Sequence, residues 1–456
     1  MHIRNTRGIR ALDSRFGNMI KSTYTRNQYI DRTSLVRTIP SMLVVEMLIC
    51  FAFVLLLIEN ALQEQISDLF SYIDEIACLL FCAAACIKIL SGRQRGVLSQ
   101  HEKWVLLATV ALCCVGLLGN VVYSVQPFVE AVGIDALTCI KFSLAYVSLC
   151  VILSDKRYVR LYDVCLIVSK VFVIIAFVCM LLNQFVGIGM SIEERFGIKA
   201  FMFVFGHPSN FAASIVGVSA LLLRDAKQNR MYLAACAVIL LSTMRFKAIA
   251  FVAVMILAMV AFRRVKRLTF TFLLLAAIVA IGAASYQLDI YLNGDTARGA
   301  LLINSIKVAN ETFPLGTGFG TYGSDVTKEY YTSLYYQLGF NSVYGLTESN
   351  PIYLADMFYS TVLAQFGWIG FFIFLCVPLC FILGSSTAAR RNEVFFWAVM
   401  SIPIYLLITS TTEPSFFSSY SVYLAFCAVA VARLPKISQR EEARNSLSYK
   451  HECWSR

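Results

Sequence analysis

The 456-residue chain is 58% hydrophobic and only 15% charged, with a mean hydropathy of +0.69. A soluble domain of this size needs a polar surface that this composition does not supply. The net charge of +11 comes from basic residues in short clusters between apolar stretches, which is typical of membrane topology and argues against a nucleic-acid partner.

Apolar stretches recur along the chain, and a helix that crosses a bilayer needs roughly 20 apolar residues. Residues 1–40 are polar and basic and lack the apolar core and cleavage site of a secretory signal. The sequence therefore predicts an all-α polytopic membrane domain over 41–433, between cytoplasmic tails at 1–40 and 434–456. The twelve predicted membrane helices lie near 41–58, 72–90, 104–123, 136–153, 163–186, 208–223, 231–243, 246–262, 268–286, 356–384, 394–410 and 416–433.

The charges of the connections alternate. The connections 59–71, 124–135 and 411–415 contain no Lys or Arg but do contain Asp or Glu. The alternate connections, which this assignment places on the other side of the membrane, carry basic clusters. Because cytoplasmic loops of membrane proteins are enriched in Lys and Arg, this pattern places both termini in the cytoplasm. We expect a multi-pass protein of the bacterial cytoplasmic (inner) membrane.

Two segments depart from a simple bundle. The apolar stretch 231–262 is interrupted only at 244–247, and it is either one overlong helix or two short helices that meet at a basic tip. The basic clusters on both sides favour the two-helix hairpin. The second segment, 287–355, is a long predicted outer loop. There Asp295 or Thr296 can cap a short amphipathic helix that ends before Pro314, and a connection of this length is usually functional.

Cations outside the cytoplasmic clusters are candidates for ligand binding. Three arginines, Arg195, Arg245 and Arg298, and the nearby Lys247 are expected toward the outer leaflet. A guanidinium is always charged and grips phosphate oxygens through two hydrogen bonds, so these residues suit a pyrophosphate-linked lipid. The alternative is that they bind lipid headgroups or terminate helices.

Asp356 opens the helix that follows the long loop, so its carboxylate is expected at the outer membrane surface. There it can act as a general base on a sugar hydroxyl, or it is simply a favourable acid in the first turn of a helix. His207 and Asn210 stand at the start of the sixth span, where Pro208 fits the first helical turn. They are candidates for glycan binding, although a lone His at such a place is more often structural.

The stretch 318–323 reads G-x-G-x-x-G, but it follows no predicted strand and is expected on the outer face, so a dinucleotide site is not expected. Gly318 and Gly320 instead allow sharp turns or close approach of the backbone to a ligand. The chain shows no P-loop, and no His or carboxylate completes a metal site around the i, i+4 series of Cys78, Cys82 and Cys86. We expect neither a metal nor another cofactor.

Three of these stretches, in this order, resemble the O-antigen polymerase and ligase superfamily, which comprises Wzy-type polymerases and WaaL-type ligases. Leu241–Lys247 is similar to a short Ser-x-Arg turn between two helices. Arg298 followed by Phe313–Gly320 is similar to an Arg and then a Pro-x-x-Gly-x-Gly segment. Asp356–Gly370 is similar to a helix that starts with an acidic residue or His and ends in Gly-x-x-Gly.

A fourth stretch, Arg195 followed after ten residues by Gly206, is similar to an Arg-x10-Gly segment of the polymerases, although the second such segment is absent. The resemblance covers roughly residues 190–385.

The resemblance implies a membrane-embedded C-type glycosyltransferase fold and a metal-independent reaction on a polyprenyl-pyrophosphate-linked oligosaccharide. It implies that Arg245 and Arg298 neutralise the leaving pyrophosphate, and that Asp356 takes the position where ligases often have a histidine. This departure favours a polysaccharide repeat-unit polymerase, with a chain-length regulator and a flippase as further partners beside membrane lipid. The alternatives are a ligase that transfers a glycan to another acceptor, and a flippase or transporter of lipid-linked sugars.

Overall fold

Helices make up most of the computed structural model, which describes residues 44–91, 98–154, 158, 160–195, 197–264, 296–388 and 393–434. The predicted span 268–286, the tail 1–40 and all but the first residue of the tail 434–456 lie outside these ranges. The elements are α3 (Val44–Gln65), η2 (Asp68–Tyr72), α4 (Ile73–Leu90), α5 (Gln100–Tyr123), α6 (Val129–Ile152), α7 (Leu161–Phe185), β1 (Ser191–Arg195), β2 (Ile198–Phe201), α8 (Pro208–Leu223), α9 (Arg230–Ser242), α10 (Phe246–Arg264), α12 (Ala297–Glu311), α13 (Val326–Glu329), α14 (Ser333–Gln337), η3 (Phe340–Ser342), α15 (Phe358–Ala388), α16 (Glu393–Thr409) and α17 (Tyr420–Arg433).

Five of the described helices, α3, α5, α6, α7 and α15, are long and apolar enough to cross a membrane. The shorter apolar helices belong to α8, α9, α10, α16 and α17. The prediction of an all-α, membrane-embedded protein is therefore confirmed. Each predicted span except 268–286 coincides with a helix, whereas the count of twelve crossings stays a prediction.

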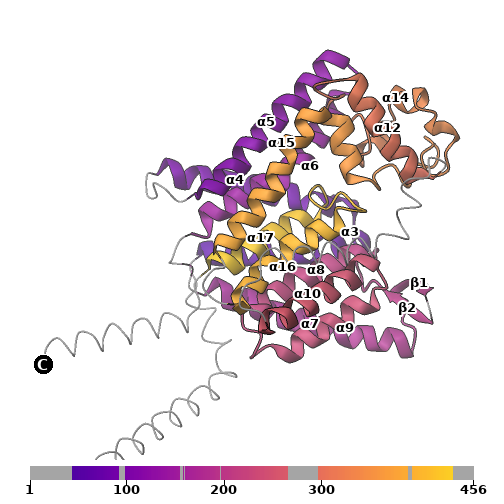
Figure 1. Ribbon diagram of the computed structural model, residues 1–456. Helices are drawn as coiled ribbons and strands as arrows, with labels where there is room; N and C mark the ends of the chain where they lie inside the picture. Colours follow the sequence, from indigo (N-terminus) through magenta and orange to yellow (C-terminus); the bar gives the residue numbers. More distant parts are fainter. Residues whose placement is uncertain are drawn as a thin grey trace, which may run out of the picture. The chain divides into compact units, whose positions relative to one another are not determined.

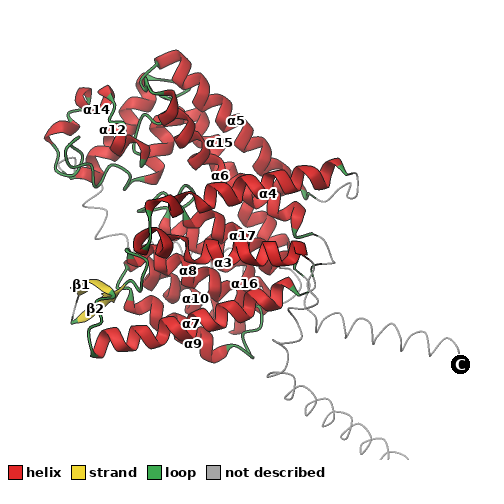
Figure 2. Ribbon diagram, turned by 180° about the vertical axis from the view of Figure 1, so that it is seen from behind, coloured by secondary structure: helices red, strands yellow, loops and turns green. Residues whose placement is uncertain are grey.

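Two groups of helices pack around α6 and α15. The helices α5, α12 and α16 pack against α15, and α4, α5 and α17 pack against α6. The helix α8 contacts α7, α9, α16 and α17, and α10 contacts α16. Figures 1 and 2 show α12 and α14 beside the end of α15, and the β1–β2 hairpin beside α7 and α9.

Local sequence explains where several helices begin. At α5, the Ser99 hydroxyl accepts the Glu102 N–H while the Glu102 carboxylate accepts the Ser99 N–H at 2.7 Å, which is a capping box. At α12, the Thr296 hydroxyl accepts the Gly299 N–H at 3.1 Å. The predicted short helix capped at Asp295 or Thr296 is thus confirmed with Thr296 as its cap, and it ends before Pro314.

The apolar stretch 231–262 is two helices, as predicted. The helices α9 and α10 pack against each other and are separated by Met244, whose φ of 51° is left-handed and breaks the helix. The Thr243 hydroxyl donates to the Leu240 carbonyl at 2.7 Å at the end of α9. Arg245 and Lys247 therefore lie at the tip of a tight helical hairpin.

The described part of the predicted long loop, 296–355, is folded. Its short helices close over a buried apolar core with the start of α15, formed by Ala300, Leu301, Val308, Tyr322, Leu334, Tyr335, Phe340, Leu346, Leu354, Met357 and Ala364. Hydrogen bonds fix this core, because the Tyr322 hydroxyl donates to the Leu301 carbonyl at 2.6 Å and the Tyr335 hydroxyl donates to Thr327 at 2.9 Å. A core of this kind gives the side chains that it carries fixed positions.

The helix α15 is interrupted at Gly367, where φ is 62° and ψ is −170°. The carbonyls that this break frees are used by the preceding loop, since Thr317 N–H donates to the Ala364 carbonyl at 3.0 Å and Gly318 N–H donates to the Gln365 carbonyl at 2.8 Å. A Cβ at Gly316 would lie 2.3 Å from Gly367 N, so the two backbones approach too closely for any side chain. The break in α15 thus anchors the loop that follows α12.

The structure corrects the sequence prediction in two places. The predicted first span stops at 58, before Glu59, but α3 continues to Gln65 with Glu59 buried inside it. The predicted fourth span starts at 136, but α6 already begins at Val129 and includes Asp135, which is also buried. In addition, β1 and β2 form an antiparallel hairpin that was not predicted.

Candidate functional site

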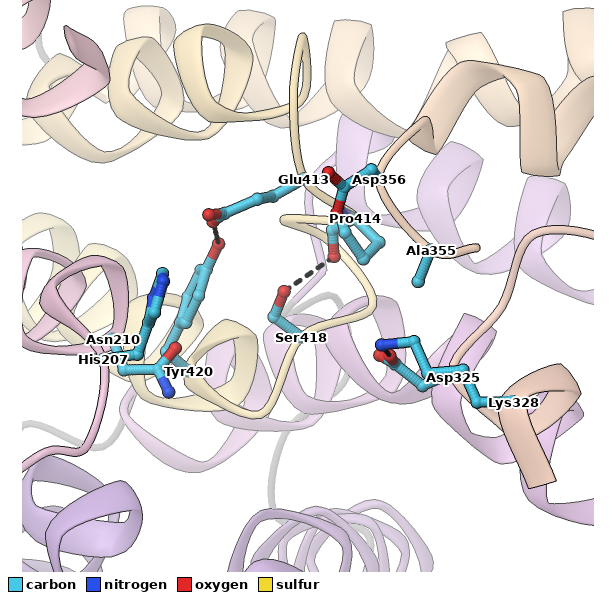
Figure 3. A pocket seen from close by; sticks show the side chains of 10 residues that line it. All are labelled: His207, Asn210, Asp325, Lys328, Ala355, Asp356, Glu413, Pro414, Ser418 and Tyr420. Carbon is cyan, nitrogen blue, oxygen red and sulfur yellow. Dashed lines mark hydrogen bonds and ion pairs between the residues drawn. The ribbon is translucent and has the colours of Figure 1, made fainter. Parts of the chain in front are cut away.

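A polar pocket lies where three segments far apart in the sequence meet: the start of α8, the folded segment before α15, and the loop between α16 and α17 (Figure 3). Its volume is about 270 Å³. The lining residues are His207, Asn210, Asp325, Lys328, Ala355, Asp356, Glu413, Pro414, Ser418 and Tyr420. Ligand pockets span roughly 300–1,000 Å³, so this one has room for a polar head and not for a whole lipid-linked oligosaccharide.

His207 lies at the N-cap of α8, with Pro208 at the first helical position. Its Nε2 lies 3.3 Å from Arg245 Nη2, and its Nδ1 lies 3.3 Å from the Ser209 N–H. Both neighbours are donors and a neutral imidazole has one acceptor nitrogen, so only one of these hydrogen bonds forms at a time. Burial, and then the positive charge of Arg245, hold the pKa of His207 below its usual value. His207 is therefore neutral at pH 7.

The two cations of the hairpin tip each face a carboxylate. Arg245 Nη2 lies 3.6 Å from Glu193 Oε1 of β1, and Lys247 forms an ion pair with Glu413. Glu413 also accepts the Tyr420 hydroxyl at 3.4 Å, as Figure 3 shows. Burial acts to raise the pKa of Glu413, but the Lys247 ammonium outweighs it and the pKa lies below its usual value. Glu413 therefore stays ionised.

Arg298, in the first turn of α12, pairs with Asp356, which lies two residues before α15. The distance from Arg298 Nη2 to Asp356 Oδ2 is 3.0 Å, and the two side chains are 30% and 27% exposed. Burial raises the pKa of Asp356 above its usual value, although Arg298 opposes the shift, and the charge of Glu413 adds to it. Because a general base works best with a pKa near the operating pH, this shift suits Asp356 to that role.

The pocket carries a further ion pair on the folded segment before α15. Lys328 Nζ lies 2.6 Å from Asp325 Oδ1, at the start of α13. The Lys328 side chain is 36% exposed and that of Asp325 is 67% exposed, so the pair is worth little to stability. Lys328 can therefore turn toward a ligand at small cost.

The predicted site residues form three groups: those at the pocket, Arg195 on β1, and two glycines away from the pocket. Asp356, His207 and Asn210 line the pocket, and Arg298, Arg245 and Lys247 contact residues that line it. The backbone of Arg195 closes β1 opposite Ile198, and its side chain lies outside the described part of the chain.

The third group is Gly318 and Gly320, which lie away from the pocket. Their loop is held by protein groups: the Phe319 N–H donates to Asn120 at 2.8 Å, and the Gly320 N–H donates to Asp135 at 2.7 Å. A Cβ at Gly318 would lie 2.4 Å from Asn120 N. Here the close backbone approach is to another helix of the protein.

Glu413, Tyr420, Asp325 and Lys328 were not predicted as site residues. Glu413 carried a signal, because it is the one charged residue of the short connection 411–415. Lys328 carried one too, as a cation outside the cytoplasmic clusters. Asp325 and Tyr420 lie in segments whose folding brings them to the pocket, and no local pattern marks them.

The arrangement can bind an anionic, polar group and can accept a proton from it or from a second ligand. Three carboxylates line the pocket, and four cations lie on it or one residue behind it. Within the described ranges, no group of three His, Cys, Asp or Glu side chains is arranged to hold a metal ion.

Fold and site together define a helical membrane protein with a polar, charge-paired pocket. Comparison of the chain with protein-family models and with curated proteins gave no match. The function must therefore be argued from the site itself.

Proposed function

We propose that this protein polymerises polyprenyl-pyrophosphate-linked oligosaccharide repeat units at the outer leaflet of a bacterial cytoplasmic membrane. One observation carries the proposal: the predicted base and both predicted phosphate-binding arginines are found at one pocket. Asp356 lines the pocket and pairs with Arg298, and His207 lines it and contacts Arg245. Asp356, Arg298 and Arg245 come from three separate segments that the resemblance had already selected, whereas His207 was a separate candidate.

The proposed reaction joins an acceptor sugar to a donor glycan. Asp356 takes the proton of the acceptor hydroxyl, whose oxygen then forms a bond to the anomeric carbon of the donor. The bond from that carbon to the pyrophosphate oxygen breaks, and the lipid pyrophosphate leaves with the electron pair. The guanidinium groups of Arg298 and Arg245 stabilise the negative charge that develops there.

The ion pair between Arg298 and Asp356 gives this reaction an order. A pyrophosphate competes with the carboxylate for the guanidinium, because both are anions that accept two hydrogen bonds from it. When Arg298 turns to the pyrophosphate, Asp356 loses the charge that lowers its pKa and becomes a stronger base. The base is thus activated by binding of the donor.

The length of the hairpin supports a site within reach of the lipid pyrophosphate. At 1.5 Å per residue, the 13 residues of α9 span about 20 Å, which is less than the roughly 30 Å of a hydrocarbon core. The tip of this short hairpin therefore lies within the membrane, where the charges of Arg245 and Lys247 need polar partners. Glu193, His207 and Glu413 provide them.

The test in cells is the length distribution of surface polysaccharide in a deletion strain that carries each variant. We expect Arg298→Ala and Arg245→Ala to lose the ladder and leave one repeat per lipid, since loss of one stabilising donor costs roughly 10²–10³ in rate. Lys307→Ala is the matched control, because Lys307 lies on α12 with Arg298 but is 57% exposed and pairs at 4.0 Å with Glu311.

Three outcomes would contradict the proposal. Intact long chains in both arginine variants would remove the proposed roles of the guanidinium groups. Products that carry single transferred blocks would indicate a ligase. Translocation of the lipid-linked sugar without chain elongation would indicate a transporter.

A further inference from the structure

A second charged cluster lies away from the pocket, between α3, α4 and α6. Glu59 of α3, Asp74 of α4 and Lys141 of α6 are 1%, 0% and 3% exposed. Lys141 Nζ lies 2.6 Å from Asp74 Oδ2 and 3.1 Å from Glu75 Oε1. Neither the proposed reaction nor the pocket uses these residues.

Glu59 has no side-chain partner in this cluster, and the backbone N–H of Asp74 faces its carboxyl without reaching hydrogen-bonding geometry. Within the described residues, neither of its carboxyl oxygens has a hydrogen-bond partner. The charged groups that act on it are Asp74, Glu75 and Lys141. The helices α8 and α17 also contact α3, through Ser214 and Tyr423, and these contacts bring no charge.

The charges of the cluster do not balance if every group is ionised. Three carboxylates would then face one ammonium, and Lys141 is already shared between Asp74 and Glu75. An ionised carboxylate buried without a partner is so unfavourable that the group takes up a proton or a cation instead. No group of three His, Cys, Asp or Glu side chains in the part of the chain that the structure describes is arranged to hold a metal ion, so the cluster is better suited to bind a proton.

We propose that this cluster is an intramembrane proton-binding site in which Glu59 holds the proton at neutral pH. Asp74 and Glu75 then remain ionised beside Lys141, which serves as their common counter-ion. Glu75 is 20% exposed and the others are nearly fully buried, so the proton enters and leaves by way of Glu75. Ionisable groups at such positions in membrane helices mark proton relays and coupling sites. This site stands whether or not the proposed polymerase function is correct.

The test is infrared spectroscopy of the full-length protein in lipid nanodiscs, where a protonated carboxyl gives a C=O band separate from those of carboxylates. At pH 7 we expect one such band that disappears in Glu59→Gln. The band should remain in the control Glu64→Gln, because Glu64 lies on the same helix but is exposed. Size-exclusion chromatography checks that each variant is folded.

A second measurement needs no substitution. In the wild-type protein, ¹³C-labelling of glutamate carboxyls should shift the band, and labelling of aspartate carboxyls should not. A shift with aspartate label, or a band that survives in folded Glu59→Gln, would overturn the assignment. A band that appears only when sodium is removed at constant pH would replace the proton by a metal cation and would overturn it equally.

Discussion

At the scale of single residues, the account depends on Asp356 and on the charges around it. Burial places its pKa above that of an ordinary aspartate, and Arg298 pulls it down again without cancelling the effect. The same two residues are the predicted base and a predicted phosphate ligand. The pH dependence of the reaction therefore reports on both.

The first prediction concerns this pH dependence. Only the ionised carboxylate of Asp356 accepts a proton, so chain elongation should fall as the pH drops through its raised pKa. Arg298→Gln removes the positive charge that lowers this pKa, so the acidic limb of the profile should move to higher pH, and Arg298→Lys should move it less. The measurement is kcat/KM for elongation against pH, which reports the free protein, in which Arg298 pairs with Asp356. An unmoved limb in Arg298→Gln would contradict the role of Asp356.

The second prediction concerns the pair of Lys247 and Glu413. Lys247 is 9% exposed, so Glu413→Gln leaves an ammonium with poor access to water and should lower the free energy of unfolding by about 1–3 kcal/mol. The double variant Lys247→Met with Glu413→Gln should regain most of that loss. Thermal unfolding in detergent measures both. A double variant less stable than Glu413→Gln alone would show that the pair is not the reason.

At the scale of elements, the break in α15 positions the site. Gly316 and Gly367 let two backbones meet, and the loop that docks there continues into the segment that carries Asp325 and Lys328. Asp356 lies just before the first part of α15, which ends at this break. Rigid contacts of this kind keep a pocket open in a membrane protein, where irregular backbone is tolerated only inside the protein.

The third prediction tests this break. In Gly367→Ala, the new Cβ would lie 2.6 Å from Gly316 N, at a φ of 62° that disfavours side chains. We expect a loss of stability of roughly 1–3 kcal/mol and loss of elongation. Gly133→Ala on α6 is the matched control, because nothing lies within 4 Å of its Cβ and alanine favours a helix. Equal melting temperatures for Gly367→Ala and wild type would contradict the argument.

Much of the element order was predictable from the sequence, because each membrane helix needs a long apolar stretch. The cap at Thr296 and the hairpin at Met244 were also predictable, because the residue types at these positions mark the end of a helix or of an apolar stretch. The β1–β2 hairpin was not, since it is short and polar. The true end of α3 was missed because Glu59 was taken as a boundary, whereas it is a buried carboxyl within the helix.

The candidate site was predictable in part. Arg298 and Asp356 were selected by position in the chain, but their pairing depends on how segment 296–357 folds. Glu413 lies 166 residues beyond Lys247 (413 − 247) and was used only as a sign of topology. Contacts between distant segments leave no local pattern, and a single sequence does not reveal them.

At the scale of the whole molecule, the orientation in the membrane is the first question. The charge pattern predicts Lys328 on the outer side and Lys227 on the cytoplasmic side. Alkaline phosphatase fused after residue 328 should be active, and green fluorescent protein fused after residue 227 should fluoresce. The reverse result for both fusions would place the pocket in the cytoplasm and would exclude an outer-leaflet reaction.

Variants of the pocket and of the buried cluster around Glu59 distinguish a polymerase from a transporter. The pocket, with its proposed base and proposed phosphate-binding arginines, suits glycosyl transfer, whereas a buried proton site, as proposed for Glu59, is a common feature of transporters. A polymerase needs the first cluster for chemistry and tolerates Glu59→Gln in a purified system without a proton gradient. A transporter would lose its activity in Glu59→Gln and keep it in Asp356→Asn.

The most direct measurement uses the purified protein in nanodiscs with a defined polyprenyl-pyrophosphate oligosaccharide as the only substrate. The account predicts a ladder of products with one polyprenyl pyrophosphate released for each bond formed. The rate should fall roughly 10²–10⁴-fold in Asp356→Asn and remain unchanged in Lys307→Ala. Absence of elongation by the wild-type protein, or equal rates in Asp356→Asn and wild type, would contradict it.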